Sequence, residues 1–225
     1  MSIEWRAESA SGDVELQWLD DALAGRPRAV LWQGVQGLSA PRSYRRHARL
    51  DEVRREFAAR GWPVELRRSG GGVVPQGPGL LNLSLASRAD ARPAAFEHVY
   101  AHLCDVLARA LAGLGIDARP RRVEGSFCDG RYNLAVGERK IAGTAQYWRR
   151  AGAAQAVLAH ALLLVDADVA LLTAQANAFE AALGSERRYR MDAHTTVAAE
   201  LRGDATNLWP RLRHQISAAS DAAAG

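Results

Sequence analysis

The apolar residues of this chain follow the period of a helix in some segments and the period of a strand in others, and the order of these segments constrains the fold. The clearest helical pattern lies in residues 92–115, where apolar side chains recur at helical spacing until Gly113 or Gly115 ends it. Shorter patterns predict helices in residues 11–25, 48–61 and 168–184, strands in 29–34 and 156–168, and a strand, a glycine-rich loop and a strand in 63–87. Helices and strands mix without a strict strand–helix–strand rhythm, so we expect an α+β fold in which helices flank a mixed, largely antiparallel sheet.

The length of the chain, 225 residues, is enough for one large domain, and we expect a single domain over residues 1–225. No apolar run approaches the roughly 20 residues of a membrane helix. The first residues also lack the uninterrupted apolar stretch of a signal peptide, so we expect a cytoplasmic protein that does not associate with membranes. Cys104 and Cys128 form no disulfide framework, and no Cys/His spacing is typical of zinc, so no metal site is predicted.

The basic residues of this chain are almost all arginine. The formal net charge is +4, and a basic surface suits nucleic acid, a membrane or an acidic protein. No nucleic-acid-binding motif is present, so nucleic acid is not an expected partner. Of the 29 strongly basic residues, only Lys140 is a lysine. Lysine is a compact point charge on a flexible stem, whereas arginine is a wide planar fork, so position 140 is a candidate site of chemistry.

A glycine-rich segment follows the first of the two strands that are predicted in residues 63–87. The letters RRSGGG at residues 67–72 place three glycines next to two arginines. Glycine amides can approach an anion or a flat ligand closely, although a plain turn with solvated arginines explains the letters equally well. The next strand, in residues 74–85, contains Asn82 among leucines, and a buried amide normally hydrogen-bonds a specific partner, either backbone or ligand.

The third notable segment, residues 125–146, combines small residues, Cys128 and a β-hairpin. Gly137 and Glu138 are the predicted turn, and Lys140 begins the second arm. A lysine at this place is either catalytic or a surface residue at the hairpin edge. Cys104, by contrast, lies beside the apolar stripe of residues 92–115 and is interpreted as a packing residue.

These segments, in this order, resemble the catalytic domain of lipoate–protein ligases, octanoyltransferases and biotin ligases, and most of all the lipoate-ligase branch. The matching letters are RRSGGG, LNLSL, RKIAGTAQ and the later LAHALLLVDADVALL, which contains His160. The resemblance covers about residues 13–200, and the residues after 200 are expected to form a short C-terminal tail. That tail is too short for the separate accessory domain of two-part ligases.

The resemblance implies a function in protein lipoylation. Members of this family transfer an octanoyl or lipoyl group to a lysine of a small, typically acidic, lipoyl-carrier domain. Lys140 would lie beside the acyl carbonyl and stabilise negative charge on its oxygen, and the glycine loop and the hairpin would enclose the acyl chain. The residues expected to contact substrate are Arg68, Ser69, Gly70, Gly71, Gly72, Gln76, Gly77, Asn82, Asn133, Gly143, Thr144, Ala145 and His160.

Two features of the sequence depart from the family pattern. Gln76 stands where the family usually has histidine, and glutamine cannot carry a proton at neutral pH. The missing accessory domain is the second departure. Both favour a transferase, which takes an acyl group that is already activated, with an acyl-carrier protein as one donor. Cys128 would then be the acyl acceptor, or alternatively a structural thiol.

Two other functions remain open from the sequence. The chain could be a ligase that uses ATP and Mg to form lipoyl-AMP and obtains its accessory domain from another chain. It could instead be a non-catalytic relative that only binds the acyl group or its carrier. No covalently bound cofactor is expected in any of the three cases.

Overall fold

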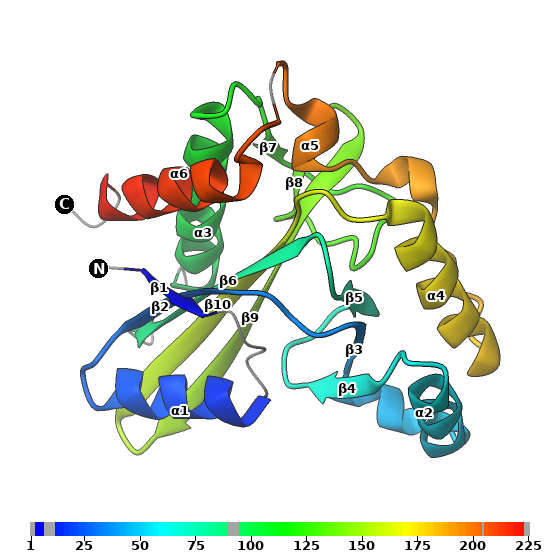
Figure 1. Cartoon of the computed structure of the whole chain (residues 1–225). Coiled ribbons are helices and arrows are strands. Elements are labelled where there is room, and N and C mark those ends of the chain that lie inside the picture. The colour runs from blue at the N-terminus through cyan, green and yellow to red at the C-terminus, as the bar shows by residue number, and fades with distance from the viewer. Residues whose placement is uncertain (1–2, 7–11, 90–94, 204, 223–225) are drawn as a thin grey trace.

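A computed structural model describes residues 3–6, 12–89, 95–203 and 205–222 (Figure 1). Its larger sheet contains β1 (Glu4–Arg6), β2 (Arg28–Trp32), β6 (Leu80–Arg88), β7 (Arg119–Pro120), β8 (Leu134–Val136), β9 (Arg139–Ala151) and β10 (Ala154–Leu164). The strand order is β1-β2-β6-β10-β9-β8-β7, and only the β1–β2 pair is parallel. The predicted α+β class with a mixed, largely antiparallel sheet is confirmed.

A smaller sheet lies beside the large one and carries the glycine loop. Its strands are β3 (Gly37–Pro41), β4 (Val64–Arg67) and β5 (Val74–Gln76), in the order β4-β3-β5. The 3₁₀ helix η1 (Arg42–Arg46) and the helices α2 (Leu50–Ala59) and α4 (Val169–Ala182) belong to this part of the molecule. Leu38, Phe57 and Phe179 are among the buried residues that pack together here. Because β4 and β5 flank the segment 68–73, both ends of the glycine loop are fixed in one sheet.

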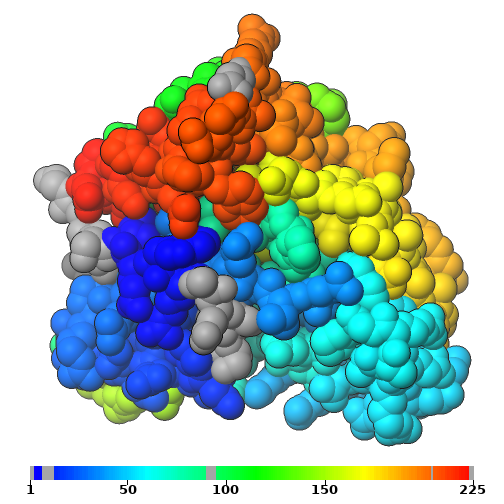
Figure 2. Space-filling view, viewed as in Figure 1, coloured from blue at the N-terminus to red at the C-terminus, as the bar shows by residue number. Residues whose placement is uncertain are grey.

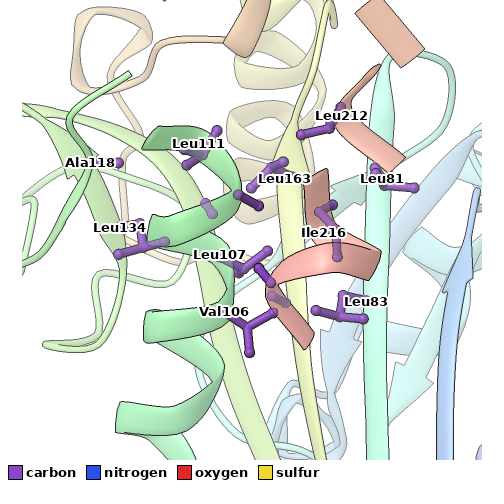
Figure 3. Close-up of a cluster of buried hydrophobic side chains, with 14 of the residues drawn as sticks. Leu81, Leu83, Val106, Leu107, Leu111, Ala118, Leu134, Leu163, Leu212 and Ile216 are labelled. Atoms are coloured by element: carbon purple, nitrogen blue, oxygen red, sulfur yellow. The ribbon is translucent and has the colours of Figure 1, made fainter. Parts of the chain in front are cut away.

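Two helices, α3 (Ala95–Ala112) and α6 (Leu208–Ala222), cover one face of the large sheet. The predicted helix 92–115 is confirmed from Ala95, and residues 92–94 lie outside the described part of the chain. Leu107 and Leu111 of α3 meet Leu212 and Ile216 of α6 over the sheet (Figure 3). The core therefore extends beyond residue 200, which corrects the expected core of 13–200, and the predicted tail contains a packed helix.

The opposite face of the sheet is covered by α1 (Gly12–Leu23), which buries Trp18 and Leu19 against Val30 and Leu158. The start of the segment predicted as 11–25, Ser11, lies outside the described residues. A further 3₁₀ helix, η2 (Met191–Ala193), and the short helix α5 (Val197–Glu200) connect α4 to α6. Within the described ranges, no helix combines the length and the apolar character needed to cross a membrane.

The predicted hairpin forms between β8 and β9. Val136 pairs with Arg139, so Gly137 and Glu138 make the turn, and Gly137 has a φ of 58° that favours glycine. Lys140 is only 2% exposed. Its burial rules out the alternative of a solvated lysine at a sheet edge.

Candidate active site

A cavity of about 410 Å³ lies between the large and the small sheet, a volume typical of small-ligand sites. Both sheets and α1 contribute to its walls. Nine of the residues predicted from the sequence line it: Arg68, Gln76, Asn82, Cys128, Lys140, Gly143, Thr144, Ala145 and His160. The structure therefore brings together residues from positions 68 to 160 around one cavity.

The side chain of Lys140 is fixed inside this cavity wall by backbone carbonyls. Its Nζ donates hydrogen bonds to the carbonyl oxygens of Phe127 and, at 3.1 Å, of Cys128. Gly143 makes room for it, because a Cβ at that position would lie 2.8 Å from Nζ. Burial lowers the pKa of Lys140 to about 8, although Cys128 and Asp129 oppose this effect. An ammonium has three N–H donors, and these two hydrogen bonds use two of them. No acceptor among the described residues takes the third, so it is available for a ligand oxygen.

His194 holds the backbone segment that binds Lys140. Its Nε2 accepts the backbone N–H of Phe127 at 3.0 Å, and its Nδ1 lies 2.9 Å from the carbonyl oxygen of Arg190. Burial, together with the charge of Lys140, lowers the pKa of His194 to about 4, so this imidazole is neutral at pH 7. The sequence analysis missed His194, because no local motif marks it and its role arises only from contacts across 67 residues.

Cys128 lies on the cavity wall between Lys140 and the glycine loop. It is a free, half-buried thiol with a φ of 51°, a left-handed conformation that is uncommon for a residue with a side chain. Asn133 supports this conformation by donating from Nδ2 to the Cys128 carbonyl at 2.9 Å. Asn133 itself lies behind the wall, and its Oδ1 has no hydrogen-bond partner among the described residues.

The glycine loop is held by Arg67 rather than by Arg68. The guanidinium of Arg67 donates to the carbonyl oxygens of Gly70 at 2.9 Å and of Gly72 at 2.6 Å. Arg68 lines the cavity, and its guanidinium has no hydrogen-bond partner in the described part of the chain. Arg67 also lines the cavity, so both arginines lie at its wall, Arg67 bound to the loop and Arg68 without a partner among the described residues.

The three loop glycines have different surroundings, and none of them lines the cavity. Gly70 faces open space. Gly71 has a φ of 104°, and a Cβ there would overlap the Sγ of Cys128. A Cβ at Gly72 would lie 2.9 Å from the hydroxyl of Tyr189. Gly77, with a φ of 141°, also lies outside the lining and packs on the backbone of Gln36.

His160 connects the glycine loop to α1. Its Nε2 lies 2.9 Å from the hydroxyl of Ser69, and its Nδ1 lies 3.4 Å from Oε1 of Glu15. Ser69 is buried behind the wall, whereas His160 and Glu15 both line the cavity. The sequence analysis identified Ser69 and His160 as site residues. It did not identify Glu15, which lies in a helix with an ordinary amphipathic pattern.

Gln76 and Asn82 pair with each other inside the cavity. Gln76 Nε2 donates to Asn82 Oδ1 at 3.2 Å, and Asn82 Nδ2 donates to Gln76 Oε1 at 3.0 Å. The hydrogen-bond partner of the buried Asn82 is therefore a side chain and not the backbone. Both amides keep further hydrogen-bonding capacity for a ligand, but neither residue can act as an acid or base at neutral pH.

Comparisons with known proteins point to one family. The family described as "Lipoyl protein ligase A/B catalytic domain" matches residues 44–219. An uncharacterized protein of Cupriavidus necator is 55% identical over 188 residues, which are 78% of this chain and 74% of that protein. An octanoyl-[GcvH]:protein N-octanoyltransferase of Kyrpidia tusciae is 39% identical over 143 residues, which are 61% of this chain and 49% of that relative. The matched part thus spans about half the length of that transferase.

Solved structures share the fold. A bi-partite lipoate protein ligase from Thermoplasma acidophilum, studied together with its E2 lipoyl domain, superposes with a TM-score of 0.64. The superposition covers 97% of this chain and 82% of that one, at 19% sequence identity. Similarity at this level of identity concerns the architecture and not the chemistry of the site.

Proposed function

This chain belongs to the lipoyl protein ligase A/B catalytic domain family, and on that premise we propose that it is an acyltransferase. It moves an octanoyl or lipoyl group onto a lysine of a lipoyl-carrier domain. Cys128 is the nucleophile that carries the acyl group between donor and acceptor. Lys140 stabilises the negative charge that forms on the acyl oxygen. The cavity beside both side chains accommodates the acyl chain.

The observation that carries this proposal is the contact between the cysteine segment and the lone lysine. The ammonium of Lys140 binds the carbonyl oxygens of Phe127 and Cys128, so its charge is held within the same residues that present the thiol. The ammonium is therefore held close to where an acyl group attached to Cys128 would lie, and it can stabilise negative charge on the acyl oxygen. The close packing of Gly71 on the Cys128 Sγ limits where that sulfur can move.

The first step transfers the acyl group from the donor to the enzyme. The Cys128 thiolate attacks the acyl carbonyl carbon and forms a carbon–sulfur bond, while the bond from that carbon to the leaving group of the donor breaks. The leaving group, a thiol or an amine, takes up one proton. The remaining N–H of Lys140 donates to the carbonyl oxygen as it becomes negative.

The second step transfers the acyl group from the enzyme to the acceptor. The neutral amine of the acceptor lysine attacks the thioester carbonyl, an amide bond forms and the carbon–sulfur bond breaks. The amine loses one proton, and Cys128 returns as a thiol or thiolate. We assign the uptake of this proton to His160, whose imidazole is held between Ser69 and Glu15 in the cavity wall.

Two features favour a transferase over a ligase. Gln76 stands where the family usually has histidine, and neither Gln76 nor its partner Asn82 supplies acid–base chemistry there. The relative from Kyrpidia tusciae is an N-octanoyltransferase that takes its group from an octanoyl-[GcvH] donor. We extend that donor class, an octanoylated carrier domain, to this chain, beside the octanoyl thioester of an acyl-carrier protein.

The test is to mix the protein with an octanoyl donor in the absence of an acceptor. Octanoyl-acyl-carrier protein and an octanoylated lipoyl-carrier domain are used separately. We expect mass spectrometry to find octanoate on Cys128, and Cys128→Ala to abolish both this adduct and transfer. Cys104→Ala is the matched control and should keep both, because Cys104 is buried in α3 and burial raises its pKa to about 11.

Other results assign a different function. If Cys128→Ala retains full transfer, the acceptor lysine attacks the donor directly. If product forms only from ATP with free octanoate or lipoate, the chain is a ligase that acts with an accessory domain, as the bi-partite ligase of the same fold suggests. If neither donors nor ATP give product while the acyl chain still binds, the protein is a non-catalytic relative.

A further inference from the structure

Three arginines of the 3₁₀ helix η1 are exposed side by side. Arg42, Arg45 and Arg46 all project to solvent, whereas Tyr44 between them is 3% exposed. Within the described ranges, the three guanidinium groups have no hydrogen bond or ion pair. This segment therefore presents three positive charges that no acidic group of the described residues neutralises.

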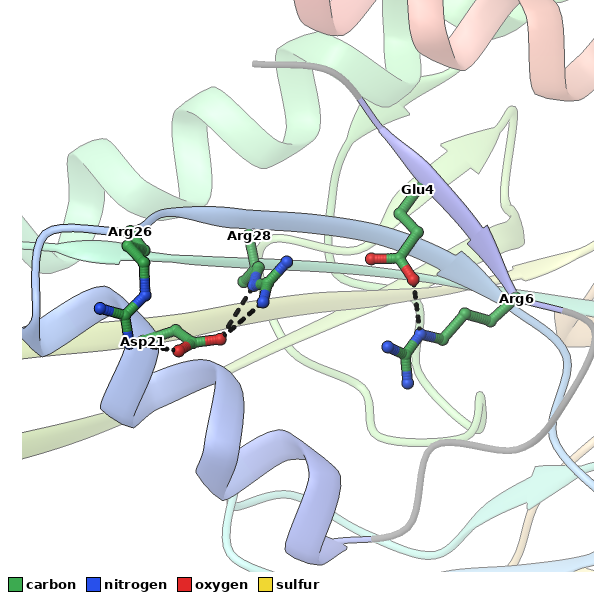
Figure 4. A network of polar contacts seen from close by, with 5 residues as sticks. All are labelled: Glu4, Arg6, Asp21, Arg26 and Arg28. Atoms are coloured by element: carbon green, nitrogen blue, oxygen red, sulfur yellow. Dashed lines mark hydrogen bonds and ion pairs between the residues drawn. The ribbon is translucent and has the colours of Figure 1, made fainter.

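Most other arginines of the chain are paired with acids. At the end of α1, Asp21 binds both Arg26 and Arg28, and Glu4 binds Arg6 (Figure 4). The helix that follows η1 also neutralises its own acids, through Arg49–Glu52, Arg54–Asp51 and Arg60–Glu56. Other unpaired arginines occur in the described residues, Arg68 among them, but η1 holds three within five residues.

The η1 arginines lie next to the cavity. Pro41, the residue before η1, pairs in the small sheet with Arg67, from which the glycine loop departs. Arg42 lines the cavity, and so does Arg68, whose guanidinium is also unpaired among the described residues. In the space-filling view, the segment with η1 and α2 forms the lower right corner of the molecule (Figure 2). A partner bound to this corner would lie beside the cavity.

The position of η1 is fixed relative to the glycine loop. The hydroxyl of Tyr44 donates to Oε1 of the buried Glu180 at 2.6 Å, and the hydroxyl of Tyr189 donates to the same oxygen at 2.8 Å. The Tyr189 hydroxyl in turn accepts the backbone N–H of Val73, at the end of the loop, at 3.1 Å. The arginines are therefore held in a defined geometry beside the loop, which suits recognition of a folded partner.

We propose that Arg42, Arg45, Arg46 and Arg68 form the docking surface for a small acidic carrier domain. This inference rests on the proposed function and names the contact that brings the carrier lysine to the cavity. Acidic groups of the carrier face the arginines. The cavity wall from α1 instead carries Asp13 and Glu15, which suit the cationic lysine that must enter. Charge complementarity of this kind accelerates association and fixes orientation.

The test measures binding and chemistry separately. Binding of an apo-lipoyl domain of negative net charge is measured by calorimetry, with wild-type protein and with the double variant Arg45→Glu/Arg46→Glu. Neither residue lines the cavity, so acylation of Cys128 by the neutral thioester octanoyl-N-acetylcysteamine should stay within about twofold of wild type. We expect Kd for the lipoyl domain to rise by about tenfold or more, and the salt dependence of binding to weaken.

The matched control is Arg88→Glu/Arg202→Glu, two exposed arginines at the far end of β6 and after α5, which should bind the lipoyl domain like wild type. A milder variant, Arg45→Gln/Arg46→Gln, keeps the test valid if the charge-reversed protein does not fold. It is expected to bind the lipoyl domain with an intermediate Kd. Equal Kd values for both charge-reversed proteins would overturn the docking surface. The proposal would also be overturned if Arg45→Glu/Arg46→Glu lost binding of octanoyl-CoA but bound the carrier domain with an unchanged Kd. The arginines would then form a phosphate site. Absence of Cys128 acylation in the wild type would instead count against the proposed function.

Discussion

At the scale of single residues, the burial of Lys140 determines when its side chain is charged. Burial disfavours the ammonium and lowers its pKa from the ordinary value of 10.5 to about 8. Below pH 8 the folded protein keeps the cation, and as the pH rises through 8 the side chain loses its proton. A role as cation therefore predicts that activity falls on the alkaline side, even though a higher pH favours the thiolate of a cysteine.

The prediction at this scale is that Lys140→Arg lowers the rate of Cys128 acylation about a hundredfold or more, because the wide guanidinium cannot occupy the place of Nζ between the two carbonyls. In wild type, the rate should decrease at alkaline pH and approach a limiting slope of about tenfold per pH unit once the thiolate fraction no longer rises. Stopped-flow acylation with a neutral thioester measures both, and circular dichroism checks that the variant is folded. Near-wild-type turnover of Lys140→Arg would contradict the role of a compact point charge.

The sequence indicated the chemically distinctive residues of the site but not their supports. Lys140 and Cys128 stood out because one is the only lysine and the other belongs to a small-residue segment before the hairpin. His194 and Glu15 did not stand out, since their types are common and their roles depend on contacts with Phe127 and His160. Such contacts join distant parts of the chain, so local patterns do not contain them.

At the scale of elements, the sequence predicted where the glycine loop lies in the chain but not what the loop contacts. The sequence led us to expect that glycines 70 to 72 contact the substrate. The structure instead places Gly71 against the thiol of Cys128 and Gly72 against Tyr189, outside the cavity lining. Glycine is needed at position 71 both for its φ of 104° and for the space taken by the sulfur. The loop thus limits the position of the Cys128 sulfur, a role that no strand or turn propensity reports.

This arrangement yields a prediction with a control in the same loop. Gly71→Ala should strongly reduce acylation of Cys128, by about a hundredfold, because the new Cβ displaces the sulfur from the cavity wall. Gly70→Ala should have little effect, since a Cβ there meets no atom within 4 Å. Intact-protein mass spectrometry over a time course measures both rates. Equal rates for the two variants would mean that the contact with Gly71 does not position Cys128.

At the scale of the whole molecule, the sequence predicted the sheet and the helix around residue 100 but not the contribution of the last helix. Leu208, Leu212, Ile216 and Ala219 of α6 do recur at helical spacing. They are few and are separated by polar and alanine residues, so the pattern alone did not distinguish a packed helix from a polar tail. Burial against α3 and the sheet decides the outcome, and that information is tertiary.

The packing of α6 leads to a prediction about the stability of the entire fold. Leu212 is fully buried in the cluster that joins α6 to α3 and the large sheet, whereas the neighbouring His214 is exposed. Leu212→Ala should lower the free energy of unfolding by roughly 2–5 kcal/mol, through lost burial and the cavity left behind. His214→Ala should change it by no more than about 0.5 kcal/mol. Urea titration followed by circular dichroism measures both values, and a single shared transition for all helices is expected. If Leu212→Ala instead melts a small helical fraction separately and leaves the midpoint of the main transition unchanged, α6 is an appendage, and the core ends near residue 200 after all.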